Sequence, residues 1–454
     1  MAGMALAVVI VLLVVGSLIF HYLSPWYFTP LASNWSTIDF TVDVTFWITG
    51  IVFVAVNLFT AYCVVKFRHR PGHRAHYEPE SSRLEFWLTA ATAVGVFLML
   101  TPGLFVWGNF VSPPEDALKF EAVGKQWHWS YRFPGQDGVL GATDVTFMTP
   151  ENPLGLDPED PNGQDDVIVA SPIVHLPLNR PVHALLRSSD VLHNFTVPQF
   201  RVKMDLVPGM VTYQWFEPTV PGNYEILCEE LCGIGHFAMR GKVVVEEESK
   251  FNAWLAGNPT FADTLALPEG NAQAGAASYA VCSACHGQRG EGNVALNAPK
   301  LAGLEGWYIR RQIHNFQNGI RGAAEGDIYG AQMAPMSRTL ANDTAMANVI
   351  AYIDTLPDNP TEATIFGDPE HGEKLFMTCA VCHGKDAKGI WSTNAPRLAG
   401  ASDWYLKRQL MNFHDRIRGG HDDDIYGEQM HMMALTLEDE AAMEDLVAYI
   451  NTLQ

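Results

Sequence analysis

The chain has 454 residues, a length that suggests several domains rather than one. Its 50 Asp and Glu residues outnumber its 29 Lys and Arg residues, which gives a formal net charge of -21. This acidic balance argues against a nucleic-acid-binding protein, because such a protein needs Lys and Arg to displace counterions from phosphates. It suits a basic protein partner instead.

Three apolar runs lie near the N-terminus, at residues 4–20, 44–65 and 86–107. Each is long enough to cross a hydrocarbon core of about 30 Å as a helix. We expect a transmembrane helix in residues 1–24 and a transmembrane helical hairpin in residues 25–110. A cleaved signal peptide is the less favoured interpretation of residues 1–24, because they lack a basic start and a small-residue cleavage site.

The link between the second and third runs is basic. It carries Lys66, Arg68 and Arg70, whereas residues 24–40 contain no Lys or Arg. Because positive charge marks the cytoplasmic side of a membrane protein, everything after about residue 110 should lie on the outer side. The sequence therefore predicts a multi-pass protein of the bacterial inner (cytoplasmic) membrane, with its later domains in the periplasm.

Six of the seven cysteines form three pairs, and the seventh, Cys63, lies within an apolar run. Two of the pairs belong to C-x-x-C-H motifs, which are typical of covalent c-type haem attachment. The two thiols bind the haem vinyl groups, and the adjacent imidazole binds the iron. The residues of the two motifs are Cys282, Cys285, His286, Cys379, Cys382 and His383.

The two motifs belong to an internal repeat with an offset of 97 residues (379 - 282). At this offset residues 298–303 match 395–400, and residues 327–330 match 424–427. The repeat predicts one small domain present twice. We expect two all-α cytochrome c domains, and the segments assigned to them and to their linkers are residues 251–272 (linker), 273–356 (first domain), 357–369 (linker) and 370–454 (second domain).

Each haem iron needs a second axial ligand, and Met is the usual one in electron carriers. Each copy offers two Met residues at matching positions: Met333 and Met336 in the first, Met430 and Met433 in the second. Spacing alone does not choose between them. We favour Met333 and Met430, because each stands seven residues before the leucine that opens the last segment, as in the small cytochromes c that this repeat resembles. His431 is a lesser alternative in the second copy.

The third cysteine pair, Cys228 and Cys232, is followed by His236 and Met239, and His193 lies upstream. Zinc favours a closed set of four Cys or His ligands. A thioether is a soft ligand that suits copper better. The set predicts a copper site, with a disulfide as the alternative in copper-free protein.

Residues 190–198 and 228–239 resemble the two copper-ligand segments of cytochrome c oxidase subunit II, and the similarity covers roughly residues 40–247. The resemblance implies a cupredoxin-like β-sandwich in residues 111–250, in which two copper ions share both thiolates. In that family one copper also takes the His and the Met, and the other takes a second His and a backbone carbonyl. The matching residues here are His193, Cys228, Glu230 (carbonyl), Cys232, His236 and Met239.

The same resemblance implies three further roles. Trp127 matches the tryptophan that receives electrons, with packing at the membrane surface as the alternative. The side chain of Glu230 is expected to reach a Mg or Mn ion at the contact with subunit I. Glu85 aligns with a glutamate at the mouth of a proton-uptake path; a salt bridge with Arg83 is the alternative.

Residues 157–166 form an acidic loop. A solvated loop is the favoured interpretation, and a calcium site is the alternative.

Taken together, the sequence predicts a multidomain membrane protein: subunit II of a proton-pumping haem-copper cytochrome c oxidase with two fused cytochrome c domains. Its cofactors would be a dinuclear copper centre and two haem c groups. Its partners would be subunit I, other oxidase subunits and a soluble donor, cytochrome c or a similar protein. No catalytic residue for oxygen reduction is expected in this chain. The alternatives are the copper-bearing subunit of a nitric oxide reductase and a membrane-tethered multihaem electron carrier.

Overall fold

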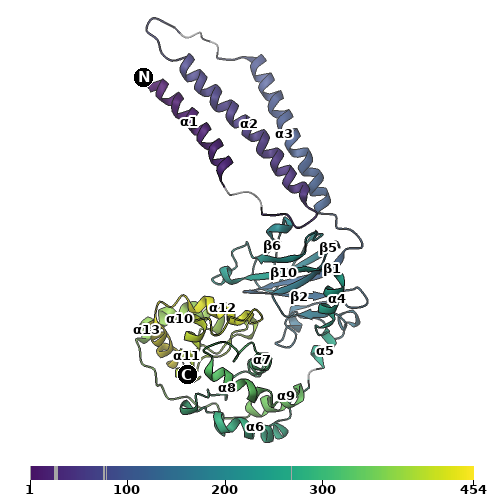
Figure 1. Ribbon diagram of the computed structural model, residues 1–454, viewed down its shortest axis with the longest axis vertical. Coiled ribbons are helices and arrows are strands. Elements are labelled where there is room, and N and C mark those ends of the chain that lie inside the picture. The colour runs from purple at the N-terminus through teal and green to yellow at the C-terminus, as the bar shows by residue number, and fades with distance from the viewer. Residues whose placement is uncertain (1, 25–28, 75–76, 78, 267, 454) are drawn as a thin grey trace.

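The computed structural model describes residues 2–24, 29–74, 77, 79–266 and 268–453. They form three tiers: a group of long helices, a β-sandwich below it, and a helical lobe that ends at the C-terminus (Figure 1). The order of the tiers agrees with the fold class expected from the sequence.

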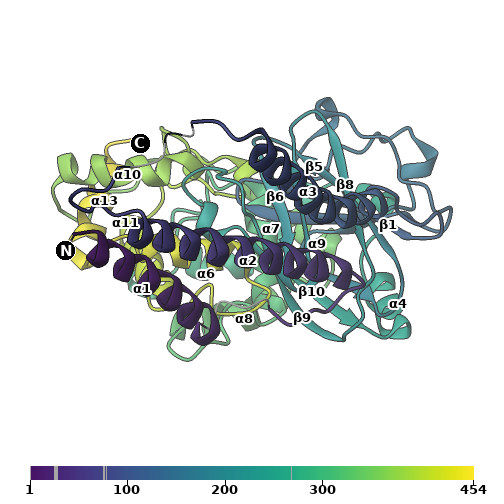
Figure 2. The same cartoon turned by 90° about the horizontal axis from the view of Figure 1, so that it is seen from above.

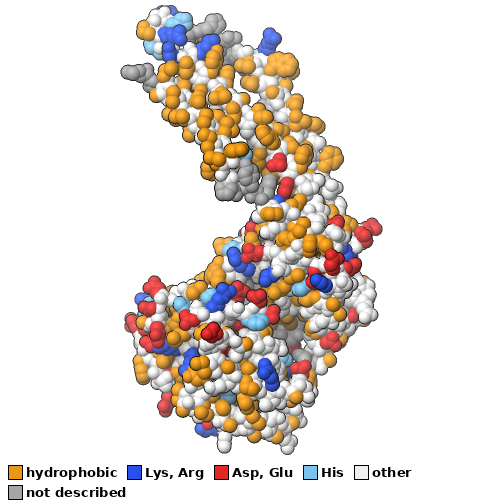
Figure 3. Space-filling model, in the orientation of Figure 1, with side chains coloured by type: hydrophobic (Ala, Val, Ile, Leu, Met, Phe, Trp, Pro, Cys, Tyr) orange, Lys and Arg blue, Asp and Glu red, His pale blue; other side chains and the backbone are white. Residues whose placement is uncertain are grey.

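Helices α1 (Ala2–Leu23), α2 (Ser36–Lys66) and α3 (Ser82–Phe110) form the first tier. By length and composition all three could cross a membrane. Most of their apolar side chains face outward, as the band over these helices shows (Figure 3). The basic link between α2 and α3 lies at the end farthest from the β-sandwich (Figures 1 and 3). This position agrees with the predicted orientation, in which the sandwich lies on the outer side.

Hydrogen bonds fix the helices to the sandwich. The Arg201 guanidinium donates to both carboxylate oxygens of Asp39 on α2, at 2.6 and 2.9 Å. Trp35 Nε1 donates to the Trp215 carbonyl at 3.0 Å, and Trp215 Nε1 donates to the carbonyl of Asn109 on α3 at 2.9 Å. These contacts hold the sandwich against the lower ends of the helices, and Figure 2 looks down on the helices from above.

Two five-stranded sheets make up the sandwich, in the orders β3-β2-β1-β5-β8 and β4-β10-β9-β6-β7. Side chains from both sheets fill its core, among them Phe120, Tyr131 and Phe195, which are fully buried. The strands are β1 (Leu118–Lys125), β2 (His128–Phe133), β3 (Val167–Val169), β4 (Ile173–Pro177), β5 (Val182–Ser188), β6 (His193–Val197), β7 (Val202–Leu206), β8 (Val211–Phe216), β9 (Gly222–Leu227) and β10 (Arg240–Glu246).

A buried ion network ties the acidic loop to the sandwich. Arg132 donates to Glu121 at 2.9 Å and to Asp166 at 2.7 Å, and Arg187 also contacts Glu121 at 3.2 Å. Burial opposes ionisation of Glu121, but the two arginines outweigh it and hold the pKa of this carboxyl below its usual value. Arg132 thus links the end of the loop, at Asp166, to the sandwich.

The segment after the sandwich is more ordered than the linker expected over residues 251–272. It contains helices α4 (Glu248–Ala256) and α5 (Phe261–Leu265), and the first cytochrome helix begins at Ala272. Phe251 packs into the sandwich core, and Phe261 packs into a smaller apolar cluster beside it. Burial of these aromatic rings explains why the segment folds onto the sandwich.

The two cytochrome domains share one helix arrangement, as the repeat predicts. In each, a tight crossing of the first and last helices needs a glycine. A Cβ on Gly275 would lie 1.9 Å from the Asn348 carbonyl oxygen, and one on Gly372 would lie 2.0 Å from that of Asp445. The helices are α6 (Ala272–His286), α7 (Gly306–Gln317), α8 (Ile328–Ser337), α9 (Asp343–Ile353), α10 (Pro369–His383), α11 (Asp403–His414), α12 (Ile425–Ala434) and α13 (Glu440–Asn451).

The two cytochrome domains contact each other through equivalent residues. The guanidinium of Arg311 lies 4.5 Å from the ring centroid of Tyr426, and that of Arg408 lies 4.5 Å from the ring centroid of Tyr329. Each residue of the first contact is 97 positions from its counterpart in the second (408 - 311 and 426 - 329). The two copies therefore pack with approximate two-fold symmetry, which requires the same patch on both partners.

Candidate functional site

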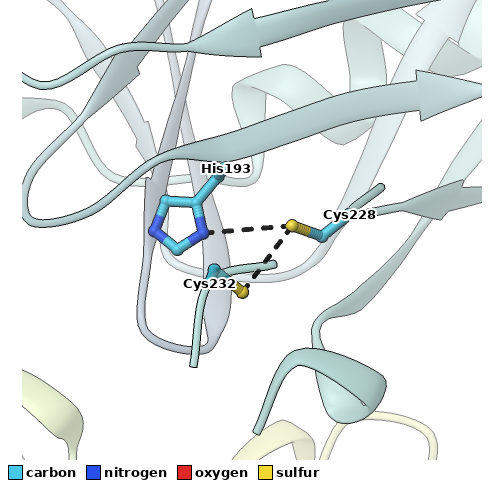
Figure 4. A group of neighbouring side chains, drawn as sticks. All are labelled: His193, Cys228 and Cys232. Carbon is cyan, nitrogen blue, oxygen red and sulfur yellow. Dashed lines mark hydrogen bonds between the residues drawn. The ribbon is translucent and has the colours of Figure 1, made fainter. Parts of the chain in front are cut away.

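The predicted copper ligands come together at one edge of the sandwich. His193 opens β6, Cys228 directly follows β9, and Cys232 lies in the loop that leads to β10. The Cys228 sulfur is 4.0 Å from His193 Nδ1 and 3.7 Å from the Cys232 sulfur (Figure 4). A disulfide would bring the two sulfurs to about 2.05 Å, and both cysteines are free thiols here.

The other three predicted ligands surround the same two sulfurs. Cys232 Sγ lies 3.4 Å from His236 Nδ1 and 3.8 Å from Met239 Sδ, and Cys228 Sγ lies 3.3 Å from the carbonyl oxygen of Glu230. Two thiols, two imidazoles, a thioether and a carbonyl thus converge in one small, mostly buried space. This soft donor set fits copper, the ion that the resemblance implies.

Electrostatics favour one thiolate in this cluster before any metal binds. A hydrogen bond with Cys232 lowers the pKa of Cys228 to about 3, although burial opposes the shift. The same contact, together with burial, raises the pKa of Cys232. A bound metal would displace the remaining proton, because thiolates are the ligating form.

Asp190 and Gln126 support the cluster, and the sequence alone did not identify either role. Asp190 Oδ1 lies 2.8 Å from His193 Nε2, which leaves Nδ1 facing the sulfurs. Asp190 Oδ2 accepts the backbone N–H of Gln126 at 2.8 Å, and Gln126 Nε2 donates to the Cys232 carbonyl at 2.7 Å. Partners of this kind orient metal ligands and fix the imidazole tautomer.

Trp127 lies directly against the ligand loop. Its Nε1 donates to the Cys232 carbonyl at 3.1 Å, and the residue is only 5% exposed. Gly235 makes this position possible, because a Cβ there would lie 2.5 Å from the Trp127 ring. On its other side, the backbone carbonyl of Trp127 accepts a hydrogen bond from Gln429 of the second cytochrome domain. Trp127 therefore lies between the predicted copper ligands and that domain.

A cavity of about 530 Å³ runs through both cytochrome domains, and both C-x-x-C-H motifs line it. His286 Nδ1 lies 2.8 Å from the Pro299 carbonyl oxygen, and His383 Nδ1 lies 2.7 Å from that of Pro396. Each Nδ1–H must donate to its carbonyl, so that Nε2 is left with a free lone pair. Burial lowers the pKa of both histidines, which keeps them neutral and able to bind a metal.

All four candidate methionines line the cavity, so the choice between Met333 and Met336, and between Met430 and Met433, stays a prediction. The two in each copy lie nearly one helical turn apart on α8 or α12. His431 is not among the described residues that line the cavity, and its Nδ1 lies 2.6 Å from the Phe413 carbonyl oxygen. This placement argues against His431 as a ligand.

Arginines give a further test of whether haem fits. Arg321 and Arg418 are buried and line the cavity. Their Nε atoms, and Nη1 of Arg408, are buried without a hydrogen-bond partner among the described residues. Buried cationic donors require acceptors, and the two propionates of a haem would supply them. The chemistry of the cavity thus fits haem c.

The remaining predicted residues lie apart from these centres. Glu85 is exposed and lies in the first turn of α3, at the end of this helix farther from the sandwich (Figure 1). The Glu230 side chain is half-buried beside the copper ligands. In the loop at residues 157–166, Asp160 accepts two backbone N–H groups and Asp166 pairs with Arg132. The only group of acidic, His or Cys side chains arranged for a metal, among the residues described, is the copper cluster.

Comparisons with known proteins agree with this architecture. Residues 118–247 match the family model described as cytochrome C oxidase subunit II, periplasmic domain, and residues 272–357 and 369–454 each match the cytochrome c model. The alternative cytochrome c oxidase subunit 2 of Bradyrhizobium diazoefficiens is 55% identical over 259 residues, which are 57% of this chain and 94% of that protein.

Two solved structures each resemble one part of the chain. The periplasmic domain of subunit II of cytochrome oxidase (CoxB) of Bradyrhizobium japonicum is 29% identical, with a TM-score of 0.24, over 32% of this chain and 96% of that one. Cytochrome c4 of Pseudomonas stutzeri is also 29% identical, with a TM-score of 0.33, over 40% of this chain and 98% of that one.

The subunit II domain implies copper and the cytochrome c domains imply haem c, in agreement with the donor atoms at each centre. The three apolar helices anchor the chain to a membrane, and the matched domain is a periplasmic one. The chain belongs to the cytochrome c oxidase subunit II family, and it carries two cytochrome c domains after the copper domain.

Proposed function

We propose that this chain is the electron-transfer subunit of a proton-pumping haem-copper cytochrome c oxidase. It takes electrons from a soluble donor, cytochrome c or a similar protein, and relays them through two c-type haems and a dinuclear copper centre to subunit I. Oxygen is reduced to water there, and no residue of this chain is assigned a catalytic role in that reaction. The observation that carries the proposal is the contact at Trp127 between the copper ligand loop and a cytochrome domain.

Two copper ions would be held by His193, Cys228, Cys232, His236 and Met239, with the carbonyl of Glu230 as the sixth ligand. The proposal rests on the close approach of these donors to the two sulfurs. The copper pair supplies a one-electron redox centre. The surrounding β-sandwich holds the ligands rigidly, which keeps the rearrangement that accompanies each transfer small.

Two haems would be attached covalently to Cys282 and Cys285 and to Cys379 and Cys382. The axial ligands would be His286 with Met333, and His383 with Met430. Each haem supplies a second kind of one-electron centre, and a Met ligand raises its potential relative to a second His. The hydrogen bonds from the two histidines to Pro299 and Pro396 support these assignments.

Subunit I would cover the ligand loop. Leu231 is 78% exposed and Phe237 is 47% exposed, although both lie next to copper ligands. Exposed apolar side chains in one place favour a protein contact. The half-buried carboxylate of Glu230 lies in the same loop and would share a Mg or Mn ion with that subunit. The complex would reside in the bacterial inner membrane.

Glu85 would take part in proton uptake. It lies at the cytoplasmic end of α3, where a carboxylate at the edge of the hydrocarbon region needs a functional reason. Its exposed position leaves it accessible to a second membrane subunit. Replacing it with Gln in the purified complex should slow proton uptake without changing the content of haem or copper.

Purification of the complex tests the whole proposal. A large haem-copper subunit should accompany the chain, and the complex should contain two copper ions and two haem c per copy of the chain. Redox-difference spectra separate c-type from a-type haem, and near-infrared absorbance reports copper. Reoxidation by O2 supports an oxidase. Reoxidation by nitric oxide but not by O2 would refute the oxidase assignment. The absence of a haem-copper subunit from the purified complex would refute it as well.

A further inference from the structure

Four residues of the second cytochrome domain face the copper domain, and we call them the docked face: Cys382, Trp391, Tyr426 and Gln429. Cys382 packs against the core of the copper domain, and Gln429 donates to the Trp127 carbonyl. The Lys125 ammonium lies 4.8 Å from the ring centroid of Trp391, and the His128 ring lies 5.7 Å from that of Tyr426. Cys382 is a predicted haem-attachment residue, and Gln429 precedes the predicted axial ligand Met430. Both lie at this contact.

The repeat provides the matching residues of the first domain, of which Cys285, Val294 and Gln332 form what we call the open face; the fourth, Tyr329, contacts Arg408 of the second domain. Cys285 and Gln332 are exposed, and Val294 is 61% exposed. The two faces differ in residue type at one position: the second domain has Trp391 where the first domain, 97 positions earlier, has Val294. A valine has no aromatic ring to offer the Lys125 cation. The asymmetry of the two domains is therefore already present in the sequence.

Lys125 explains why the docked face needs an aromatic ring. This lysine is only 8% exposed, and burial lowers its pKa. A buried cation requires compensation, and the face of an indole supplies it more effectively when water is excluded. The open face of the first domain could not compensate Lys125 if the two domains exchanged places.

We propose that the two cytochrome domains have fixed, unequal places in the electron path. The second domain passes electrons to the copper domain through the contact of Gln429 with Trp127, and the first domain receives them from the external donor. Each transfer moves one electron, so the donor is oxidised by one and the copper domain is reduced by one, and no other reactant is required. This order rests on the proposed function.

Coverage of Trp127 excludes the simpler alternative. A donor that delivered electrons directly at Trp127 would need access to it, but the residue is 5% exposed and hydrogen-bonded to the second domain. Because the domain is part of the same chain, its local concentration at the contact is high, of millimolar order for a short tether. A diffusing donor must therefore use another surface.

Photocrosslinking tests the arrangement without relying on activity. In the purified, fully loaded complex, p-benzoylphenylalanine replaces Trp391 in one variant and Val294 in a matched variant. A soluble c-type cytochrome is added as the donor before illumination. The variant at 391 should crosslink within the chain, to the peptide that contains Lys125, and the variant at 294 should crosslink to the added cytochrome. The reverse pattern would overturn the proposal.

Stopped-flow reduction gives a second, independent readout. Trp391→Ala should slow copper reduction about tenfold while the haems are reduced by the added cytochrome at the wild-type rate. Val294→Ala should do the opposite: slower haem reduction by the added cytochrome, and normal transfer onward to copper. Equal slowing of copper reduction by both variants would contradict the order.

The proposed function and the proposed order fail in different ways. If no haem-copper subunit accompanies the chain but the crosslink at 391 reaches the copper domain, the order stands and the oxidase assignment fails. If the complex reduces O2 but the variant with p-benzoylphenylalanine at position 294 is the one that crosslinks to the copper domain, the oxidase assignment stands. The proposed order of the two cytochrome domains then fails.

Discussion

Asp190 Oδ1 lies 2.8 Å from His193 Nε2, on the side of the imidazole opposite the two cysteine sulfurs. The same carboxylate accepts the backbone N–H of Gln126, whose neighbour is Trp127. Burial alone would lower the pKa of His193, but hydrogen bonds with Asp190 and Cys228 outweigh it and raise this pKa. One acidic side chain therefore orients a proposed copper ligand and also holds the backbone next to Trp127.

Removal of this carboxylate should weaken copper binding. Loss of such a partner typically lowers metal affinity about 10–100-fold, and we expect a loss in this range for Asp190→Ala. Competition with a chelator, followed by copper absorbance in the purified complex, measures it. Asp190→Asn keeps an oxygen that can accept from the imidazole, so it should recover most of the affinity. If Asn binds copper as poorly as Ala, charge rather than orientation is responsible.

The cysteine pairs and the histidines that follow them were the easiest candidates to find in the sequence, because they stand together in short motifs, and the structure brings Cys228 and Cys232 together with the distant His193. The partners of those residues were harder to predict. Asp190 lies in the same segment as His193, but its second partner, Gln126, is 64 positions away and meets it only because β1 and β5 are paired. Such pairings depend on the register of the strands, which periodicity does not reveal.

The place of the second cytochrome domain was not predictable either. Gln429 and Trp127 are 302 positions apart, and their contact depends on how two domains dock. The linker expected at residues 251–272 illustrates another limit. Phe251 and Phe261 are each 1% exposed, and their burial holds this segment on the sandwich as two short helices. These aromatic residues were the signal for an ordered segment.

Paired methionine variants should identify the axial ligands. Met333→Leu or Met430→Leu should each remove about half of the charge-transfer band of Met-ligated haem and lower the potential of one haem, since a thioether ligand raises it. The matched variants Met336→Leu and Met433→Leu should leave the band intact. Redox titration with visible spectroscopy measures both quantities. Loss of the band in the second pair instead would assign those residues as ligands.

The buried ion network should matter for stability. Arg132→Met leaves Glu121 and Asp166 buried with less compensation, and breaking such a pair typically costs about 3–5 kcal/mol. We expect a loss of this size for the copper domain, measured as the urea midpoint at which copper absorbance disappears. Arg187→Met is the matched comparison, because Arg187 pairs with Glu121 but not with Asp166, and its loss leaves Arg132 in place. Similar losses in both variants would show that Asp166 contributes little.

A pH-dependent interaction holds the linker between the cytochrome domains. Asp403, which is 1% exposed, accepts the backbone N–H groups of Thr364 and Ile365 at 2.5 and 2.8 Å, and the amide of Asn451 at 3.1 Å. Burial opposes ionisation, but these hydrogen bonds lower the pKa of Asp403 below its usual value of 3.8. The first domain has Gly306 at the equivalent position (403 - 97), so this interaction is specific to the second domain.

Because the folded-state pKa is lowered, the charged form of Asp403 stabilises the second domain at any pH above about 3.8, and this effect is lost as the pH falls through the lowered pKa. Asp403→Asn should therefore reduce the unfolding free energy of this domain at pH 7 by about 1–3 kcal/mol. The difference from the wild type should shrink in acid. Circular dichroism in the Soret region during urea unfolding, repeated from pH 3 to pH 7, measures it. Asp422 is exposed, so Asp422→Asn serves as a control and should not change the unfolding free energy. If the difference between Asp403→Asn and the wild type persisted at the lowest pH, the charge of Asp403 would not be its cause.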